Sequence, residues 1–259
     1  MDTLTNRVEI FDLGFQKATL SEAVKIIIDA AGKDTKALVV TPNVDQVVQL
    51  EKNPEVREIY TKAEFVFVDG MPLVWFSRLL PEEYHLPERV NGTNLMLNTC
   101  EAAAKEGFSI AMVGGKEGAA EEAAKKLQEK FPGIKIAGTY CPPFGFEKDE
   151  VENEKIQKMV DSWNPTFLFV GVGNPKQEKW IYKNWDQLNF TIAMGIGSAI
   201  ELIAGQVKRA PLWMQENGLE WLYRLLQEPG RLWKRYLVQE MKFIPIACRE
   251  YKRIKKISR

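Results

Sequence analysis

The feature that most constrains the fold is an alternation of short apolar runs with helical stretches, joined by brief polar turns. The apolar runs are Val8–Phe15, Ala37–Thr41, Glu64–Asp69, Ile110–Gly115, Ile134–Tyr140, Phe167–Gly171 and Phe190–Gly195. Helical patterns between them begin at Thr19, Val44, Pro72, Asn91, Ala119, Glu147 and Pro175. Strands that alternate with helices favour a mostly parallel sheet covered by helices on both faces. We therefore expect an α/β, Rossmann-like fold.

From Ser198 onward the pattern is helical alone, and aromatic residues are crowded among basic ones. We place a boundary near Gly205, which divides the chain into an α/β core, 1–205, and a helical appendage, 206–259. The formal net charge is zero, yet residues 207–259 hold 13 Lys/Arg against 5 Asp/Glu, a net of +8. The preceding 206 residues then carry a net of −8. This asymmetry indicates an anionic partner for the appendage, either a membrane surface or nucleic acid.

The end of the appendage, Leu232–Arg259, interleaves aromatic and aliphatic residues with Lys and Arg. Such a segment suits the interface of an anionic bilayer, although it could also pack on the core as an ordinary amphipathic helix. No nucleic-acid-binding module is recognisable, so we expect no nucleic-acid partner. No run approaches the roughly 18 apolar residues of a transmembrane helix, so membrane contact is expected to be peripheral.

The three cysteines, Cys100, Cys141 and Cys248, are widely spaced and odd in number. Neither a disulfide framework nor a zinc site is implied. A reduced, cytoplasmic setting is the simpler interpretation.

The run Glu64–Asp69 ends in one carboxylate, followed by Gly70 and Pro72 at the start of the next helical segment. This is typical of a buried parallel strand that delivers a single side chain to the rim of a sheet. Ligands of open α/β sheets bind beyond the carboxyl ends of the strands. Asp69 could therefore act as a general base, hold a metal, or cap the following helix.

Polar residues also follow two other strands. Thr41 and Asn43 come after the second strand, and the segment Gly171–Glu178 combines glycines with a proline suited to a helix start. The pair Gly114 and Gly115 is a weaker candidate for cradling phosphate, because it fits neither the Rossmann nor the P-loop fingerprint. Tight turns with ordinary capping would explain each of these segments equally well.

The sequence lacks the residues that several kinds of catalysis require. There is no Asp-x-Asp pair to hold a metal against a nucleotide-sugar diphosphate, and the single histidine, His85, lies in a Pro/Glu-rich loop. A serine or cysteine nucleophile would lack a His partner. A metal-free reaction would instead need cationic side chains to stabilise a leaving phosphate. The appendage offers Arg209, Arg224, Arg231 and Arg235, which could equally form a solvated basic face.

Three blocks of the sequence resemble the WecG/TagA/CpsF glycosyltransferase family, with order and spacing kept from about Phe11 to Tyr236. They are Val68–Trp75 with Pro87–Gly92, then Gly171–Trp180, then Arg209–Trp213 with Gly218–Leu225 and Glu228–Arg231. Asn91 departs from the pattern, which more often has Thr or Ser there. The resemblance implies transfer of a sugar from a UDP-sugar to a polyprenyl-diphosphate-linked sugar at the cytoplasmic membrane face, without metal or other cofactor.

The TagA-like branch, which this chain most resembles, uses UDP-N-acetylmannosamine and undecaprenyl-diphosphate N-acetylglucosamine in teichoic acid synthesis. By this resemblance Asp69 would be the base, and Arg224 and Arg231 would close over the diphosphate. The implied substrate-binding residues, including the glycine candidates above, are Thr41, Asn43, Arg89, Asn91, Gly92, Gly114, Gly115, Gln177 and Glu178. Another UDP-sugar donor, such as N-acetylmannosaminuronic acid, remains open, as do a non-catalytic nucleotide-binding scaffold and a homo-oligomer.

Overall fold

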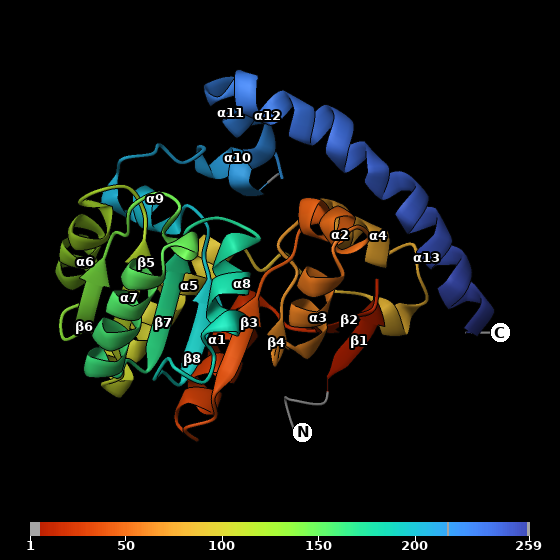
Figure 1. Ribbon diagram of the computed structural model, residues 1–259. Coiled ribbons are helices and arrows are strands. Elements are labelled where there is room, and N and C mark those ends of the chain that lie inside the picture. Colours follow the sequence, from red (N-terminus) through yellow and green to blue (C-terminus); the bar gives the residue numbers. More distant parts are fainter. Residues whose placement is uncertain (1–5, 217, 258–259) are drawn as a thin grey trace.

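The computed structural model describes residues 6–216 and 218–257, without the side chains of residues 216, 231, 235 and 237. Its centre is an eight-stranded sheet in the order β1-β2-β4-β3-β8-β7-β5-β6 (Figure 1). All neighbouring strands run parallel except the antiparallel pair at the β1 edge. The strands are β1 Arg7–Ile10, β2 Leu13–Gln16, β3 Ala37–Val40, β4 Phe65–Val66, β5 Ser109–Gly114, β6 Lys135–Tyr140, β7 Phe167–Gly171 and β8 Ile192–Gly195.

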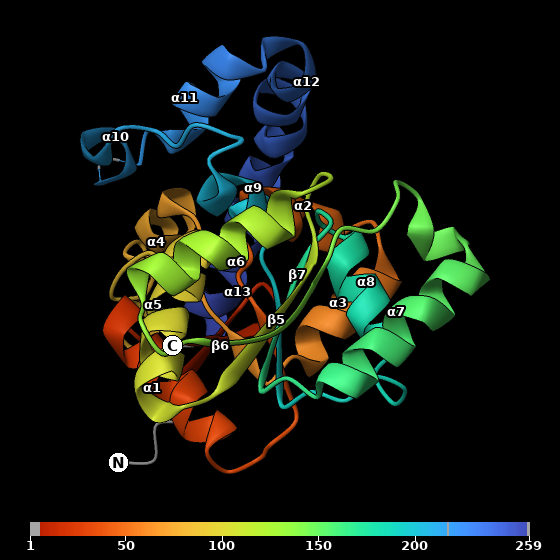
Figure 2. The same ribbon diagram turned by 90° about the vertical axis from the view of Figure 1, so that its left-hand side faces the viewer.

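Helices cover both faces of this sheet, as Figure 2 shows. One buried cluster lies between the sheet and α1, α5, α6 and α9, and a second lies between the sheet and α2, α3, α4, α7 and α8. Successive strand residues point to opposite faces, so Val39 enters the first cluster and Val40 the second. The helices are α1 Leu20–Ala31, α2 Val44–Leu50, α3 Pro54–Lys62, α4 Met71–Ser77, α5 Gly92–Glu106, α6 Ala119–Lys130, α7 Glu150–Trp163, α8 Lys176–Lys183 and α9 Ala199–Ala204. The α/β, Rossmann-like architecture expected from the sequence is confirmed.

The expectation of one strand over Val8–Phe15 is wrong. The segment is a hairpin, β1 and β2, that turns at Phe11 and Asp12, whose φ angles are 58° and 60°. A two-residue hairpin turn of type I′ needs positive φ at both turn residues, and Asn-Gly or Asp-Gly pairs usually mark it in a sequence. The Phe-Asp pair carries no such mark. Its turn is held instead by a distant residue, since the Phe11 N–H donates to Glu250 Oε1 at 2.7 Å.

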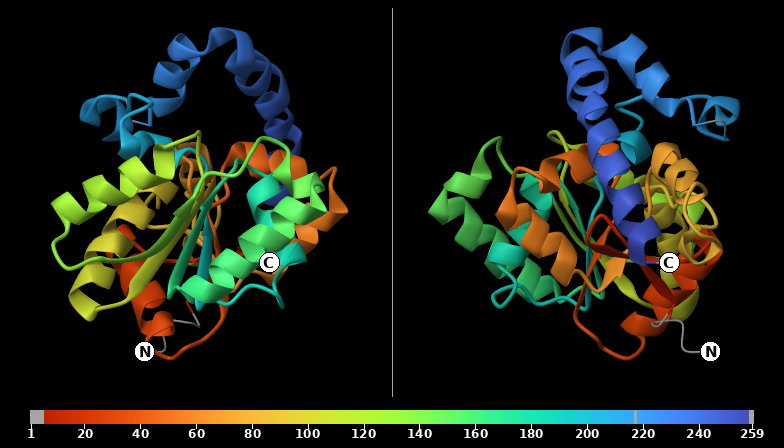
Figure 3. Two further views of the ribbon diagram at one scale, coloured as in Figure 1. Left: turned by 60° about the vertical axis from the view of Figure 1, so that its left-hand side comes forward. Right: turned by 90° about the vertical axis from the view of Figure 1, so that its right-hand side faces the viewer.

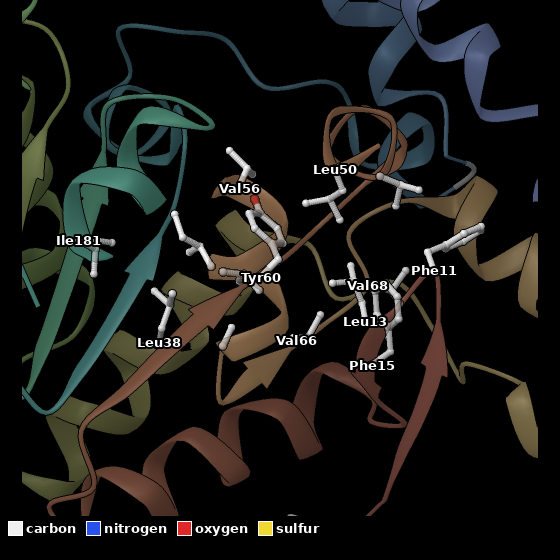
Figure 4. Close-up of a cluster of buried hydrophobic side chains, with 14 of the residues drawn as sticks. Phe11, Leu13, Phe15, Leu38, Leu50, Val56, Tyr60, Val66, Val68 and Ile181 are labelled. Atoms are coloured by element: carbon white, nitrogen blue, oxygen red, sulfur yellow. The ribbon is translucent and has the colours of Figure 1, made fainter. Parts of the chain in front are cut away.

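The appendage continues beyond α9 as α10 Leu212–Glu216, α11 Glu220–Gln227, α12 Pro229–Lys234 and α13 Phe243–Ile257. Helices α10 and α11 lie over the carboxyl ends of the strands, and α12 to α13 arch from there down the β1 edge (Figures 1 and 3). Ile246 and Ile254 of α13 belong to the second buried cluster, whose central part Figure 4 shows. The appendage thus covers one end of the sheet and is anchored at its far end on the core. No helix of the described ranges is long and apolar enough to cross a membrane.

Candidate active site

A cavity of about 400 Å³ lies where the carboxyl ends of β3, β4, β7 and β8 face the appendage. The core and the appendage both line it, and it collects most of the site residues expected from the sequence. The expected residues that line it are Thr41, Asn43, Asp69, Arg89, Asn91, Gly92, Gln177, Glu178 and Arg224. The side chain of Arg231, the remaining expected catalytic residue, lies outside the described part of the chain.

Asp69 reaches the cavity because the chain stays extended beyond β4. The backbone N–H groups of Phe67 and Asp69 donate to the carbonyls of Val40 and Pro42 in the neighbouring segment, each at 3.0 Å. The carboxylate accepts from Asn91 Nδ2 at 3.2 Å and from the Gly92 N–H at 3.3 Å, at the start of α5. It does not cap the helix that follows it, and instead lies at the N-terminus of α5. Helix N-termini stabilise negative charge, so α5 supports the ionised carboxylate.

The pKa of Asp69 is raised from 3.8 to about 6 because the carboxylate is withdrawn from water. The neighbouring Arg89 guanidinium, whose Nε lies 3.8 Å from Oδ1, and the donors of Gly92 and Asn91 oppose this rise. The negative charge of Glu220 adds to the rise. A carboxylate with a pKa near 6 is ionised at neutral pH yet basic enough to accept a proton.

Position 92 has little room for a side chain. A Cβ there would lie 3.1 Å from Thr41 Oγ1 and 3.9 Å from Asp69 Oδ2. A side chain at position 92 would therefore crowd the Thr41 hydroxyl, which would have to shift by a few tenths of an ångström. Asn43 lines the same wall, but its side chain caps α2 by accepting from the Asp45 N–H at 2.9 Å.

Gln177 and Glu178, at the start of α8, form the opposite wall and are both nearly fully buried. Gln177 Oε1 accepts from the Gly197 N–H at 3.0 Å, and its Nε2 donates to Glu178 Oε1 at 2.9 Å. Glu178 also accepts from the Tyr60 hydroxyl at 3.1 Å and from Asn174 Nδ2 at 3.1 Å. Burial raises the pKa of Glu178. This network fixes the orientation of the Gln177 amide in the cavity wall.

Three residues of the site and its supporting network were not expected from the sequence: Tyr60, Asn174 and Glu220. Tyr60 belongs to the apolar face of α3, and nothing in that pattern marks its hydroxyl as part of a polar network. Arg209 was recognised only as an available cation. Glu220 lies inside the Gly218–Leu225 block, so its place in that block was the one available signal.

The glycine pair after β5 lies beside a second cavity, of about 770 Å³, that adjoins the first at Gly173, Gly197 and Ser198. Gly115 lines this second cavity. Gly114 has φ +128°, and a Cβ there would lie 2.4 Å from the Gly171 carbonyl oxygen. It allows the ends of β5 and β7 to meet closely, so its part in the site is to shape the turn.

His85 is partly buried, and its Nε2 lies 3.0 Å from the Leu80 carbonyl oxygen, away from both cavities. Within the described residues, no group of three or more His, Cys, Asp or Glu is placed to hold a metal ion.

Comparisons with known proteins show which family the chain is similar to. The family described as "Glycosyl transferase WecG/TagA/CpsF family" matches residues 8–257. Curated relatives from Staphylococcus aureus strains MW2 and NCTC 8325 are each 30% identical over 244 residues, which is 93% of this chain and 91% of the relative. Both relatives are named N-acetylglucosaminyldiphosphoundecaprenol N-acetyl-beta-D-mannosaminyltransferase.

Proposed function

The chain belongs to the WecG/TagA/CpsF glycosyltransferase family, and we propose that it transfers N-acetylmannosamine from a UDP-linked donor to a lipid-diphosphate-linked N-acetylglucosamine. The names of its relatives support this sugar and this acceptor. The observation that carries the proposal is the Asp69 carboxylate, with a pKa near 6, in a cavity bounded by Arg89 and Arg224. A base and a cationic wall in one cavity are what a metal-free sugar transfer needs.

In the proposed reaction Asp69 takes the proton of an acceptor hydroxyl. The hydroxyl oxygen then forms a bond to the anomeric carbon, and the bond from that carbon to the diphosphate breaks. UDP leaves with the electron pair of the broken bond, and the sugar configuration is inverted because attack and departure occur on opposite faces. Arg224, and by its motif Arg231, would stabilise the negative charge that develops on the leaving diphosphate.

We place the nucleotide end of the donor in the second cavity and the transferred sugar in the first. The two cavities adjoin at Gly173, Gly197 and Ser198, so one extended ligand can reach both. Gly115 lines the second cavity, which supports its expected role at the donor. Thr41, Asn43 and Gln177 would then contact the sugars near Asp69.

We propose further that the appendage, 206–259, works as a unit that rests on the anionic inner face of the cell membrane. Large apolar side chains on α10 to α13 are exposed, among them Trp221, Leu226 and Trp233. Trp75 of α4 and Leu79, just after that helix, are also exposed, and Gly218 of the appendage lies against Met71 and Trp75. Exposed aromatic residues with neighbouring lysines suit a bilayer interface, where the lipid-linked acceptor must be met.

The test is release of UDP from a panel of UDP-sugars, with and without a lipid-diphosphate N-acetylglucosamine acceptor. We expect acceptor-dependent release from UDP-N-acetylmannosamine, unchanged by added EDTA. Release only from another UDP-sugar, such as a uronic acid derivative, would show that the donor is not UDP-N-acetylmannosamine and would leave the family assignment unchanged. Transfer that EDTA abolishes and Mg²⁺ restores would contradict the metal-free reaction.

A further inference from the structure

Glu220, the first residue of α11, is a buried carboxylate surrounded by three arginines. It is only 8% exposed. Its Oε2 accepts from Arg89 Nη2 at 3.0 Å, and its Oε1 lies 3.9 Å from Arg209 Nε and 3.9 Å from Arg224 Nη2. The three cations come from three segments: the loop before α5, the link after α9, and α11 itself. Glu220 is therefore the point at which these segments meet.

The three guanidinium groups repel one another across this small space. Burial lowers the pKa of Arg209, and the charges of Arg89 and Arg224 lower it further, whereas Glu220 opposes the change. Without Glu220, Asp69 would be the other nearby carboxylate for the three cations, of which Arg89 and Arg224 line the cavity. Like charges in a poorly solvated site separate unless a counter-charge holds them.

The contacts of the three arginines with Glu220 are not equivalent. Arg89 is bound closely to Glu220, and its Nε also faces Asp69 at 3.8 Å. Arg209 and Arg224 lie beyond hydrogen-bond distance from Glu220. Arg209 Nε is buried and has no hydrogen-bond partner among the described residues. Arg209 Nη2 donates to Asn91 Oδ1 at 3.3 Å, and Arg224 Nη2, in the cavity wall, donates to Ser198 Oγ at 3.5 Å, so each guanidinium has further N–H groups that an incoming anion could take up.

We propose that Glu220 is a positioning residue that holds Arg209 and Arg224 ready for the diphosphate of the donor, while Arg89 stays bound to Glu220 and Asp69. The proposal rests on the proposed function, because it assigns the anion as the diphosphate of the UDP-sugar. It adds Arg209 to the residues that bind this group. It also separates Arg89, which acts beside the base, from the arginines that receive the leaving group.

The same observations link Glu220 to Asp69 by two routes. Arg89 contacts both carboxylates. Arg209 Nη2 donates to Asn91 Oδ1 at 3.3 Å, and Asn91 Nδ2 donates to Asp69 Oδ1 at 3.2 Å. Removal of the Glu220 charge should lower the pKa of Asp69, since a nearby negative charge disappears and Arg89 is left to Asp69 alone.

The competing explanation is that Glu220 only fastens the appendage to the core. The chain offers a matched control, because Glu51 also joins the two through an ion pair with Arg249 at 2.6 Å, outside both cavities. Glu51→Gln removes an appendage contact and leaves the arginine cluster intact. Glu220→Gln removes the charge at the cluster with little change in size, and Glu220→Asp keeps the charge but shortens its reach.

The experiment measures binding of UDP to the full chain by calorimetry, together with kcat/KM for the acceptor between pH 5 and pH 8. We expect Glu220→Gln to raise the Kd of UDP about tenfold, Glu220→Asp by less, and Glu51→Gln to leave it unchanged. We also expect the acid limb of kcat/KM to move to lower pH in Glu220→Gln alone, which a fastening role would not cause.

Unchanged or tighter UDP binding in a folded Glu220→Gln variant would overturn the proposal, as would an equal loss in Glu51→Gln. A wild-type chain that binds no UDP would instead contradict the proposed function. If Glu220→Gln fails to fold, Glu220→Asp decides by the same two measurements.

Discussion

Asn91 donates a hydrogen bond of 3.2 Å to the carboxylate of Asp69 and, with its own oxygen, accepts from the first turn of the helix it caps. One side chain thus starts α5 and fixes the orientation of the Asp69 carboxylate. A Thr or Ser at this position could also cap the helix, because both are favoured cap residues. The difference from the usual family residue is therefore compatible with an intact site.

The first prediction concerns pH. Because the pKa of Asp69 is raised to about 6, the carboxylate is protonated at lower pH and could not act there as the proposed base. We expect kcat/KM for the acceptor to fall about tenfold per pH unit below pH 6 and to level off above it. Steady-state assays between pH 4.5 and pH 8 check this. An acid limb near pH 4, the ordinary range of an exposed aspartate, would contradict the burial argument.

The second prediction is that Asp69→Asn loses transfer by a factor of about 10² to 10⁴ and still binds UDP. Its stability should also change with pH. Folding favours the protonated form of Asp69, so the wild type loses stability relative to Asp69→Asn as pH rises from about 4 to about 6. Above that range the relative change amounts to about 3 kcal/mol. Urea unfolding at pH 4 and pH 7.5 measures it, with exposed Asp29→Asn as the control.

The third prediction concerns the wall formed by Gln177. Both Glu178 oxygens accept hydrogen bonds. In Glu178→Gln, one of these oxygens is replaced by an NH₂ group, which would face the NH₂ group of Gln177 or Asn174, so that two donors would meet. We expect Glu178→Gln to lower kcat/KM for transfer about tenfold or more, as the Gln177 amide turns away. Tyr60→Phe removes one bond to Glu178 without this conflict, so a smaller loss is expected. Equal effects of the two variants would argue against an orienting role for Glu178.

The fourth prediction separates two glycines with positive φ. In Gly114→Ala the new Cβ would lie 2.4 Å from the Gly171 carbonyl oxygen, so β5 and β7 must move apart. Gly118 has φ +74° with no described atom within 4 Å of a Cβ, so Gly118→Ala meets only backbone strain. We expect a loss of more than about 3 kcal/mol for the first and about 1 kcal/mol for the second, measured by urea unfolding.

The fifth prediction concerns the membrane surface. Leu226 of α11 is 71% exposed, and Val151 of α7, on the core, is 79% exposed. We expect wild-type chain to sediment with phosphatidylglycerol vesicles and less with phosphatidylcholine vesicles, and Leu226→Glu to weaken binding several-fold. Val151→Glu is the control and should bind like wild type. Equal losses in both variants would show that the appendage is not the contacting surface.

The sequence by itself determined the alternation of strands and helices, and with it the sheet with two covered faces. Local sequence is enough to predict these elements. A strand buried on both faces must be continuously apolar, and a helix start is marked by a capping residue such as Asn91 at α5. The sequence also predicted that Asp69 follows a strand, and ligands of parallel α/β sheets bind beyond the carboxyl ends of the strands.

Only the tertiary structure decided what surrounds that carboxylate. Its pKa depends on burial and on Arg89 and Glu220, which stand 20 and 151 positions away in the chain. The turn at Phe11 likewise depends on Glu250, near the other end of the chain. Charge and hydrogen-bond partners act through distance in space, and periodicity reports only which face of an element is buried. The carboxylate that we propose as the base could therefore be found in the sequence, whereas the arginine cluster around Glu220 required the folded chain.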